Sequence, residues 1–406
     1  MRRLIITQSE ADLTSHAGLG LIGMALNECT NLAADTEGVS PMRSDAMGHA
    51  NILSSYIALL CLGKSDFEAI NGFREDDYFT TALGLDQVPS EGTLRQRMDS
   101  CATEFQPLVE NAAIEFLLRS GAVLTPLDNG LMPLDCDVTP FDNSRTKKEG
   151  VGRTYKGTDG YAPMAAYLGQ EGYCLELELR DGIQHCQKGT PDFLARVLGR
   201  ARQLTAGSFL LRLDSGNDAI ENIAVVAAHN EQDEKAARVQ YLIKWNPRRE
   251  NPEKWLDYAE EYGDWSEPRP GKRVALFDVI ETRTHDGYEY PLRRVMRVIE
   301  RTIDKHGQRL LVPEIEIEGW WTSLWFDEET IIALYADHGT SEQFHSEFKT
   351  DLDIERLPSG KFATNALILA CAQLACPTYC VGPGRTVCLA RMPRHVTTRN
   401  VDVSAP

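Results

Sequence analysis

Residues 335–349, YADHGTSEQFHSEFK, form the stretch from which the architecture of this chain can be deduced. A capping box, T-x-x-Q at residues 340–343, predicts a helix that begins near residue 341. On that helix Glu342, His345 and Lys349 follow at steps of three and four residues, which places them on one face. Aromatic residues spaced four apart form an apolar face that anchors the helix. On spacing alone, a solvated face of a surface helix is the simpler explanation, and the rest of the chain must decide.

The preceding part of the chain predicts a mixed sheet of the α/β class. The expected strands are 131–142, 161–169, 173–180, 208–216 and 239–246, and the expected helices are 190–204 and 217–230. Residues 170–172 join the second and third strands as a hairpin. The helix at 190–204 has Thr190 as its predicted cap and Pro191 at its first position. Because a hairpin comes first and helix-linked strands follow it, the sheet should be mixed.

Acidic residues lie at the ends of two of these strands. Asp135 and Asp137 lie on the first strand, and Asp214 ends the strand at 208–216. Each of them alone is most simply a strand-end or capping aspartate. Together with Glu342 they form an all-carboxylate set, which favours a hard cation such as Mg²⁺ or Mn²⁺. Two such ions about 4 Å apart support phosphoryl transfer.

Changes in composition divide the chain into five parts. We predict a helical N-terminal domain (1–128), the first part of an α/β core (129–246), a β-rich insertion (247–327), a second core part with the glutamate helix and the helix after it (328–375), and an irregular tail (376–406). In the first part, residues 88–101 fit a helix-turn-helix, with Arg95 and Arg97 after the turn, and also fit an ordinary helical hairpin. Strands in the insertion are expected at 274–284, 290–300, 308–317 and 322–327.

The overall composition is that of a soluble globular protein with two or three domains. The chain has 406 residues, 42% of them hydrophobic and 25% charged. No apolar run approaches the roughly 18 residues of a membrane span, and the N-terminus is a poor signal peptide, so we expect a cytoplasmic protein. Ten cysteines without a C-x-x-C pair indicate free thiols. The net charge of −18 argues against a general affinity for nucleic acid, so any DNA contact should use local basic patches.

These residues carry a resemblance to a known family. The chain resembles the DDE transposases of bacterial insertion sequences, in the branch with the signature Y-x2-R-x3-E-x6-K, and is most similar to the insertion sequence 1380 family. Tyr335, His338, Glu342 and Lys349 have this spacing, with His338 in place of the arginine. The segments DHGTSEQFHSEFKTDLDIERLPSGKFATNALIL, LLRLDSGNDAIEN and LDCDVT carry the match, and similar segments run from about residue 85 to 370.

The resemblance implies an RNase H-like core, interrupted by a β-rich insertion before the glutamate helix. It also implies that the helical N-terminal domain (1–128) binds DNA ends. It implies that Asp137, Asp214 and Glu342 are catalytic and hold two Mg²⁺ (or Mn²⁺) ions, with Asp135 as the alternative first acid. The implied activity is cut-and-paste transposition, in which the inverted repeats are nicked, a freed 3′ hydroxyl attacks, and the strand is transferred into target DNA. The implied partners are double-stranded DNA, from the element's own repeats and the target, and a second copy of the chain in a synaptic dimer. Such a protein has no membrane partner and is nucleoid-associated when it acts.

Two groups of residues are expected to contact DNA. The resemblance implies such a role for Tyr335, His338 and Lys349. The basic segment after the first acid adds Arg145, Lys147, Lys148, Arg153 and Lys156. Some relatives stack a flipped base on an aromatic ring, for which Trp320, Trp321 and Trp325 are candidates, although a core position is the commoner role of tryptophan in a small β domain.

Two features depart from the family pattern. Histidine at position 338 lacks the bidentate fork with which arginine binds phosphate, and it is mostly neutral at pH 7. The tail after residue 376 loses helical periodicity where relatives continue with helices. The alternative function is therefore a catalytically impaired relative that only binds DNA ends.

Overall fold

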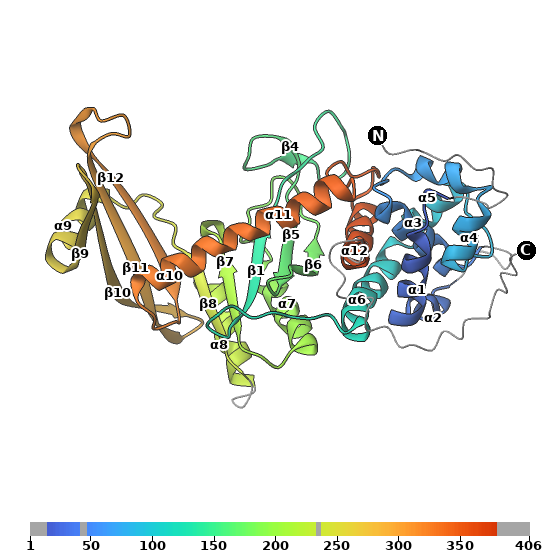
Figure 1. The fold of residues 1–406 in the computed structure, drawn as a ribbon, viewed down its shortest axis with the longest axis horizontal. Coiled ribbons are helices and arrows are strands. Elements are labelled where there is room, and N and C mark those ends of the chain that lie inside the picture. Colours follow the sequence, from blue (N-terminus) through green and yellow to red (C-terminus); the bar gives the residue numbers. More distant parts are fainter. Residues whose placement is uncertain (1–13, 41–46, 233–236, 380–406) are drawn as a thin grey trace, which may run out of the picture.

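The computed structural model describes residues 14–40, 47–232 and 237–379, except for the side chains of residues 339–343, 347 and 377–379. It has a helical cluster at one end, a large sheet in the middle and an arm of long strands at the other end (Figure 1). Within the described residues, no helix combines the length and apolar character needed to cross a membrane.

One nine-stranded sheet runs through the protein in the order β6-β5-β1-β7-β8-β12-β11-β10-β9. Its central strands are β1 (Met132–Val138), β5 (Met164–Leu168), β6 (Tyr173–Glu178), β7 (Phe209–Leu213) and β8 (Val239–Lys244). The strands β1, β7 and β8 are parallel, whereas β5 is antiparallel to both β1 and β6. The mixed sheet predicted from the sequence is therefore confirmed. Three short strands after β1 form a separate small sheet: β2 (Phe141–Asp142), β3 (Gly152–Arg153) and β4 (Asp159–Tyr161).

Both faces of the central strands are covered, which explains their nearly continuous apolar sequences. Every residue of β5 and β7 is buried. The helices α7 (Thr190–Leu204) and α8 (Ile220–Gln232) cover one face (Figure 1). The predicted cap of α7 is wrong, because the N-cap residue is Gly189 and the buried Thr190 hydroxyl donates to the Cys186 carbonyl instead.

The other face carries a nearly continuous helical path. It consists of α10 (Glu328–Ala336), a 3-10 turn (η3, Asp337–Thr340), α11 (Ser341–Ser346) and a π-helical turn (η4, Glu347–Asp351), and it passes over β7, β1 and β5 (Figure 1). The helix α11 begins at Ser341, as the capping box predicted. The expectation that one regular helix also carries Lys349 is wrong, because the regular helix ends at Ser346. The chain before Ser341 is helical as well. The π turn shifts the phase of the following side chains, so Lys349 no longer continues the face of α11.

The arm contains α9 (Pro252–Tyr262) and four antiparallel strands: β9 (Asp264–Arg269), β10 (Lys272–His285), β11 (Tyr288–Ile303) and β12 (Arg309–Thr322). It continues the central sheet, since residues 320–322 of β12 pair with residues 242–244 of β8. The three long strands agree with predicted ones. The strand predicted at 322–327 is wrong, because the chain leaves the sheet after Thr322 and the Asp327 carboxylate accepts from the Thr330 N–H to cap α10.

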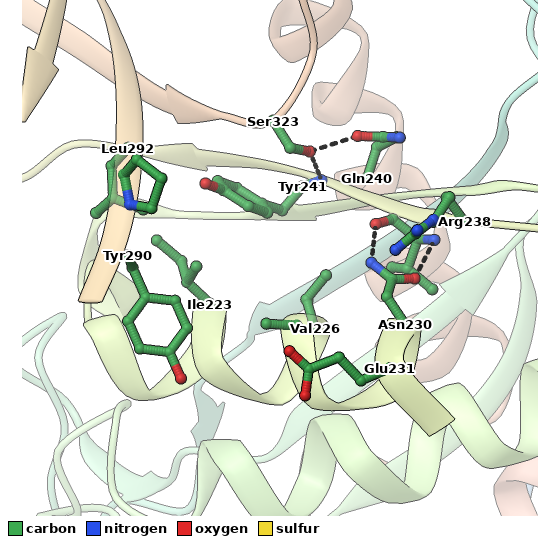
Figure 2. Close-up of a pocket in the computed structure, with 13 residues that line it drawn as sticks. Ile223, Val226, Asn230, Glu231, Arg238, Gln240, Tyr241, Tyr290, Leu292 and Ser323 are labelled. Atoms are coloured by element: carbon green, nitrogen blue, oxygen red, sulfur yellow. Dashed lines mark hydrogen bonds between the residues drawn. The ribbon is translucent and has the colours of Figure 1, made fainter. Parts of the chain in front are cut away.

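Within residues 14–40, 47–232 and 237–379, no strand pairs with the first half of β8 on its β12 side, and side chains complete this edge instead (Figure 2). The Asn230 side chain accepts from the Val239 N–H and donates to the Val239 carbonyl, both at 2.9 Å. The Ser323 hydroxyl accepts from the Tyr241 N–H at 3.0 Å. These residues line a cavity of about 410 Å³ between α8, β8 and the start of β11. Their bonds occupy backbone groups that would otherwise present an open edge to another chain.

Helices from both ends of the described chain form one cluster. The helices before the sheet are α1 (Leu19–Cys29), α2 (Leu32–Glu37), α3 (His49–Cys61), a 3-10 helix (η1, Phe67–Phe73), α4 (Asp77–Leu83), α5 (Glu91–Ser100) and α6 (Ala102–Ser120). The apolar helix α12 (Phe362–Tyr379) follows the sheet and packs against α3 and α6. It extends into the stretch predicted to be irregular, of which residues 380–406 lie outside the described residues.

Ser90 caps the start of α5, since its side chain accepts from the Thr93 N–H. Arg97 on α5 is buried, and its Nη1 donates to the Met47 carbonyl and lies 2.9 Å from Nδ1 of His49. Helix-turn-helix and helical hairpin remain alternatives for this segment, but Arg97 is an interior residue in either case.

Candidate functional site

The register between β1 and β7 brings two pairs of charged residues together. Asp135 on β1 lies beside Arg212 on β7. Asp137 and Asp214 each follow two residues later, so they lie side by side at the carboxyl edge of this strand pair. Because side chains alternate along a strand, Asp135 and Asp137 share one face, the face crossed by α10 and α11.

Asp135 is saturated with hydrogen-bond donors in the interior. Arg212 donates to its two carboxylate oxygens at 2.6 and 2.7 Å, and a third bond of 2.8 Å joins Arg212 to the Leu334 carbonyl in α10. His338 places Nδ1 3.0 Å from the same carboxylate. Burial raises the pKa of Asp135, but the bonds from His338 and Arg212 outweigh it and leave the pKa below its ordinary value. Asp135 therefore ties β1, β7 and α10 together.

Asp137 and Asp214 are more open and share no such cation. The Asp137 side chain is 25% exposed, accepts from the Val138 N–H at 2.7 Å, and lies 3.3 Å from Nε2 of His345. By geometry, that nitrogen has no hydrogen-bond partner among the described residues, so the two groups are close without a well-aligned bond. Asp214 accepts from the Asn217 side chain at 2.7 Å. Among the described residues, no lysine or arginine forms an ion pair with either acid.

The pKa values of the two acids are shifted in opposite directions. Burial, followed by the negative charge of Asp137, raises the pKa of Asp214 above its ordinary value. Burial also raises the pKa of Asp137, but the proximity of His345 and His338 outweighs it and lowers the pKa of this carboxyl. Two neighbouring carboxylates without a matching cation favour the binding of a positive ion.

Glu342 lies in the first turn of α11, and its side chain is outside the described part of the structure. The neighbouring side chains fix the helix on the sheet. His345 places Nδ1 3.0 Å from the Tyr167 hydroxyl, and the rings of Tyr167 and Phe344 lie 5.2 Å apart. Phe344 also packs on Gly172 in the β5–β6 turn, where φ is +73° and a Cβ atom would meet the ring at 2.1 Å. Because His345 is buried, the face on which it lies is not a solvated surface.

The other signature residues surround the acidic pair in different ways. Burial, followed by the charges of Asp214 and Asp137, raises the pKa of Tyr335, so its hydroxyl stays protonated beside them. Burial lowers the pKa of Lys349, whose Nζ lies 5.7 Å from the ring of Phe141. His338 faces Asp135 in the interior, and a contact between His338 and DNA remains a prediction.

The basic segment forms a loop beside the end of β1. The Tyr155 hydroxyl donates to the Val138 carbonyl at 3.1 Å and holds the loop there. Lys148 donates to Asn143 and to the Leu357 carbonyl, so it anchors the loop. The exposed cations of the loop are Arg145, Lys147, Arg153 and Lys156.

The three candidate tryptophans differ in exposure. Trp320 and Trp321 are 2% and 0% exposed and belong to the core. Trp325, in the turn between β12 and α10, is 80% exposed. Of these three, only Trp325 can meet a base without unfolding.

Sequence reasoning missed the residues that support the acids. The signal for Arg212 is present, because a charged residue inside the buried run FLLRL requires a buried counter-charge. Asn217 lies three residues after Asp214, within the segment LLRLDSGNDAIEN, so its bond to Asp214 is local. No comparable signal marks Tyr167, which reaches the site only through the fold.

The donor set fits a hard divalent cation. Asp137 and Asp214 offer carboxylate oxygens on adjacent strands, and Glu342 belongs to the helix above them. Among the described side chains, no group of three or more His, Cys, Asp or Glu residues is arranged as a metal site, and the Glu342 side chain is not one of them. Two carboxylates of the expected set are thus together.

Comparisons with known proteins give a family match over most of the chain and weak similarities to solved structures. Residues 2–379 match the family described as Transposase DDE domain group 1. No curated protein matches the chain. Among solved structures, the chain is similar to a piggyBac transposase synaptic complex with hairpin DNA, at 12% identity over 89% of this chain and 73% of that chain, with a TM-score of 0.41. It is also similar to Kluyveromyces polysporus Argonaute with a guide RNA, at 10% identity over 80% of this chain and 40% of that chain, with a TM-score of 0.20. Both TM-scores are too low for the fold to be inferred from these structures.

Proposed function

Because the chain belongs to the Transposase DDE domain group 1 family, we propose that this transposase moves an insertion sequence by cut-and-paste transposition. The proposed chemistry is metal-dependent phosphoryl transfer. It comprises nicking at the inverted repeats, attack by the freed 3′ hydroxyl, and strand transfer into target DNA. The observation that carries the proposal is the juxtaposition of Asp137 and Asp214 at the carboxyl edge of the sheet, with the helix of Glu342 packed over β1 and β5.

Members of this family generally use divalent metal ions, and we propose Mg²⁺ or Mn²⁺ here. Asp137, Asp214 and Glu342 would hold two such ions. When bound, they would lower the pKa of the attacking water or hydroxyl and stabilise the leaving oxygen.

The remaining residues prepare the site. The Asp135–Arg212 pair holds β1 and β7 in the register that places the two acids together. His345 lies against the Asp137 carboxylate and restricts its orientation. The Tyr335 hydroxyl remains a donor and is available to a phosphate oxygen. Lys349 and the exposed cations of the 145–156 loop would contact neighbouring phosphates as positive charges.

We further propose an RNase H-like core of a bacterial transposase of the insertion sequence 1380 type. The order β6-β5-β1-β7-β8, with the hairpin at one side and parallel strands at the other, supports this core. The proposed parts are the DNA-end-binding N-terminal domain, the two core parts and the insertion, with boundaries as predicted from the sequence. A homodimer is proposed for the synaptic complex, in the cytoplasm and at the nucleoid.

A cleavage assay tests the proposed function. The inverted repeats found in the DNA that flanks the gene supply the substrate, and products are resolved on denaturing gels with and without Mg²⁺. We expect Mg²⁺-dependent nicks at the repeat ends, which Asp214→Asn abolishes. Asp192→Asn, at an exposed acid on α7, is the matched control and should cut normally. Cutting by Asp214→Asn at the wild-type rate would refute the proposed site.

The catalytically impaired alternative has one supporting observation. Where the family signature has arginine, the buried His338 is bonded to Asp135. A protein that shifts repeat DNA on a native gel without nicking it, in either Mg²⁺ or Mn²⁺, would establish this alternative.

A further inference from the structure

A cavity of about 480 Å³ beside the chain segment after β8 is rich in cations. Its charged lining residues are the cations Arg248, Arg249, Lys254 and Arg283 and the acids Asp218 and Glu250. Arg283 lies 3.7 Å from Asp218 and 2.9 Å from Glu281, so its charge is partly balanced. Arg249 and Lys254 are exposed and have no ion pair with any described residue. The cavity therefore presents an excess of positive charge on a protein whose net charge is −18.

Hydrogen bonds connect this cavity to the acidic pair. The Asn246 N–H donates to Asp218 at 2.8 Å, and the Asn246 side chain donates to the Ser215 carbonyl at 3.2 Å. Ser215 directly follows Asp214. Because β7 and β8 are parallel, both segments leave the sheet at the same edge. The cavity thus lies about one strand beyond Asp214, on the side away from β1.

The start of α9 adds a second attraction for an anion. Asn251, a lining residue, is the N-cap of this helix and accepts from the Glu253 N–H at 3.0 Å. The helix dipole favours negative charge at such a terminus. Lys254, in the first turn of α9, brings a full positive charge to the same place.

We propose that this cavity binds a backbone phosphate of the DNA strand that crosses the acidic pair. The inference rests on the proposed function. Strands of a sheet are about 4.8 Å apart, and successive phosphates of one strand rise about 3.4 Å along the helix axis. The bound phosphate would therefore lie within the first few nucleotides from the cut. With the 145–156 loop at the end of β1, the acids have cations on both sides.

DNA binding and its salt dependence test this assignment. The probe is a fluorescent 30-bp duplex of arbitrary sequence, because phosphate contacts do not depend on sequence, and anisotropy gives the dissociation constant at several salt concentrations. Arg249→Gln and Lys254→Gln should each weaken binding several-fold, roughly tenfold at low salt, and lower the slope of log affinity against log salt by about 1. Arg249→Lys should retain binding, and Glu250→Gln should strengthen it. Lys305→Gln, at the exposed turn between β11 and β12, removes the same charge far from the cavity and should leave the slope unchanged.

The assignment is overturned if Arg249→Gln and Lys254→Gln keep the wild-type slope, or if Lys305→Gln lowers it as much. The second result would mean that only net charge matters. These outcomes are separate from the proposed function, which the nicking of repeat DNA by the wild-type protein decides. If all the cavity variants bind and nick DNA normally, the cavity assignment is overturned and the proposed function is not.

Discussion

The substitution Asp135→Asn should reduce stability, whereas Asp137→Asn should reduce catalysis, although the two acids lie on one face of one strand. Asp135 accepts bonds of 2.6 and 2.7 Å from Arg212, whose side chain is 2% exposed. The substitution Asp135→Asn would leave the guanidinium buried without a counter-charge, and removing one partner of a buried pair costs about 3–5 kcal/mol. This loss should shrink at acid pH. The pKa of Asp135 is lower in the folded protein than in the unfolded chain. The stabilisation that ionised Asp135 gives to the folded state is therefore present above the ordinary pKa of about 3.9 and is lost as the pH falls through the pKa of the folded protein.

At position 137 stability should change little and catalysis should fail. The substitution removes a charge that raises the pKa of Asp214, and it gives up the contact with His345, so the two effects oppose each other. We expect a change in stability within about 1 kcal/mol. Loss of a proposed metal ligand should slow nicking by at least about 10³-fold, equivalent to about 4 kcal/mol.

Hydrogen exchange and cleavage separate the two effects. Exchange of peptides from β1 and β7 reports local opening, which is better defined than one unfolding free energy for a chain of this size. Asp135→Asn should expose these peptides, and the double variant Asp135→Leu with Arg212→Met should recover most of their protection. The reasoning fails if Asp137→Asn nicks DNA at the wild-type rate, or if Asp135→Asn leaves exchange unchanged.

Three further predictions concern the same region. Asp214→Asn should raise the thermal midpoint of unfolding at pH 7 without metal and lose this advantage near pH 4, because the raised pKa of Asp214 means that its ionised form opposes folding only at higher pH. Mg²⁺ should raise the midpoint of the wild type and not that of the variant, and an equal gain by the variant would contradict the site. Cys186 should react with iodoacetamide before the other cysteines among the described residues, because it is half-buried and they are buried. Its Sγ lies 2.9 Å from the Gly216 carbonyl, so bound DNA should protect it. Peptide mass spectrometry measures the order of reaction, and a different order would contradict the prediction. Trp325→Ala should leave the unfolding midpoint nearly unchanged but weaken binding of unpaired bases by about 1–3 kcal/mol. Trp321→Ala should instead lower the free energy of unfolding by about 3–5 kcal/mol. Equal stability of the two variants would argue against placing Trp321 in the core and Trp325 on the surface.

Much of the central sheet could be predicted, because its strands are buried on both faces and its helices are amphipathic. Such segments carry clear periodicity, and the runs at 208–216 and 190–204 became β7 and α7. The errors lie where local patterns compete with tertiary contacts. The cap of α7 shifted to Gly189 because the Thr190 hydroxyl found a partner in Cys186, and the helix after Ser346 widened into a π turn.

The candidate site shows the same division. Sequence spacing identified the helix of Glu342 and the strands that carry Asp137 and Asp214, because period and turn signals are local. Spacing did not show which of Asp135 and Asp137 is the first catalytic acid, because residues two apart on a strand point to the same face.

The sequence by itself determined the family and the main strands and helices of the central sheet, and it proposed the acids of the candidate set. Only the tertiary structure decided that Asp135, and not Asp137, is paired with a buried arginine. The register of β1 against β7 joins residues 77 positions apart, and it places Arg212 beside Asp135 and Asp214 beside Asp137. Pairing between distant strands depends on how the whole core packs, and a shift of one residue would turn every side chain to the other face. For the same reason, the sequence alone could not reveal that the stretch after β8 brings a cluster of cations to the same edge of the sheet.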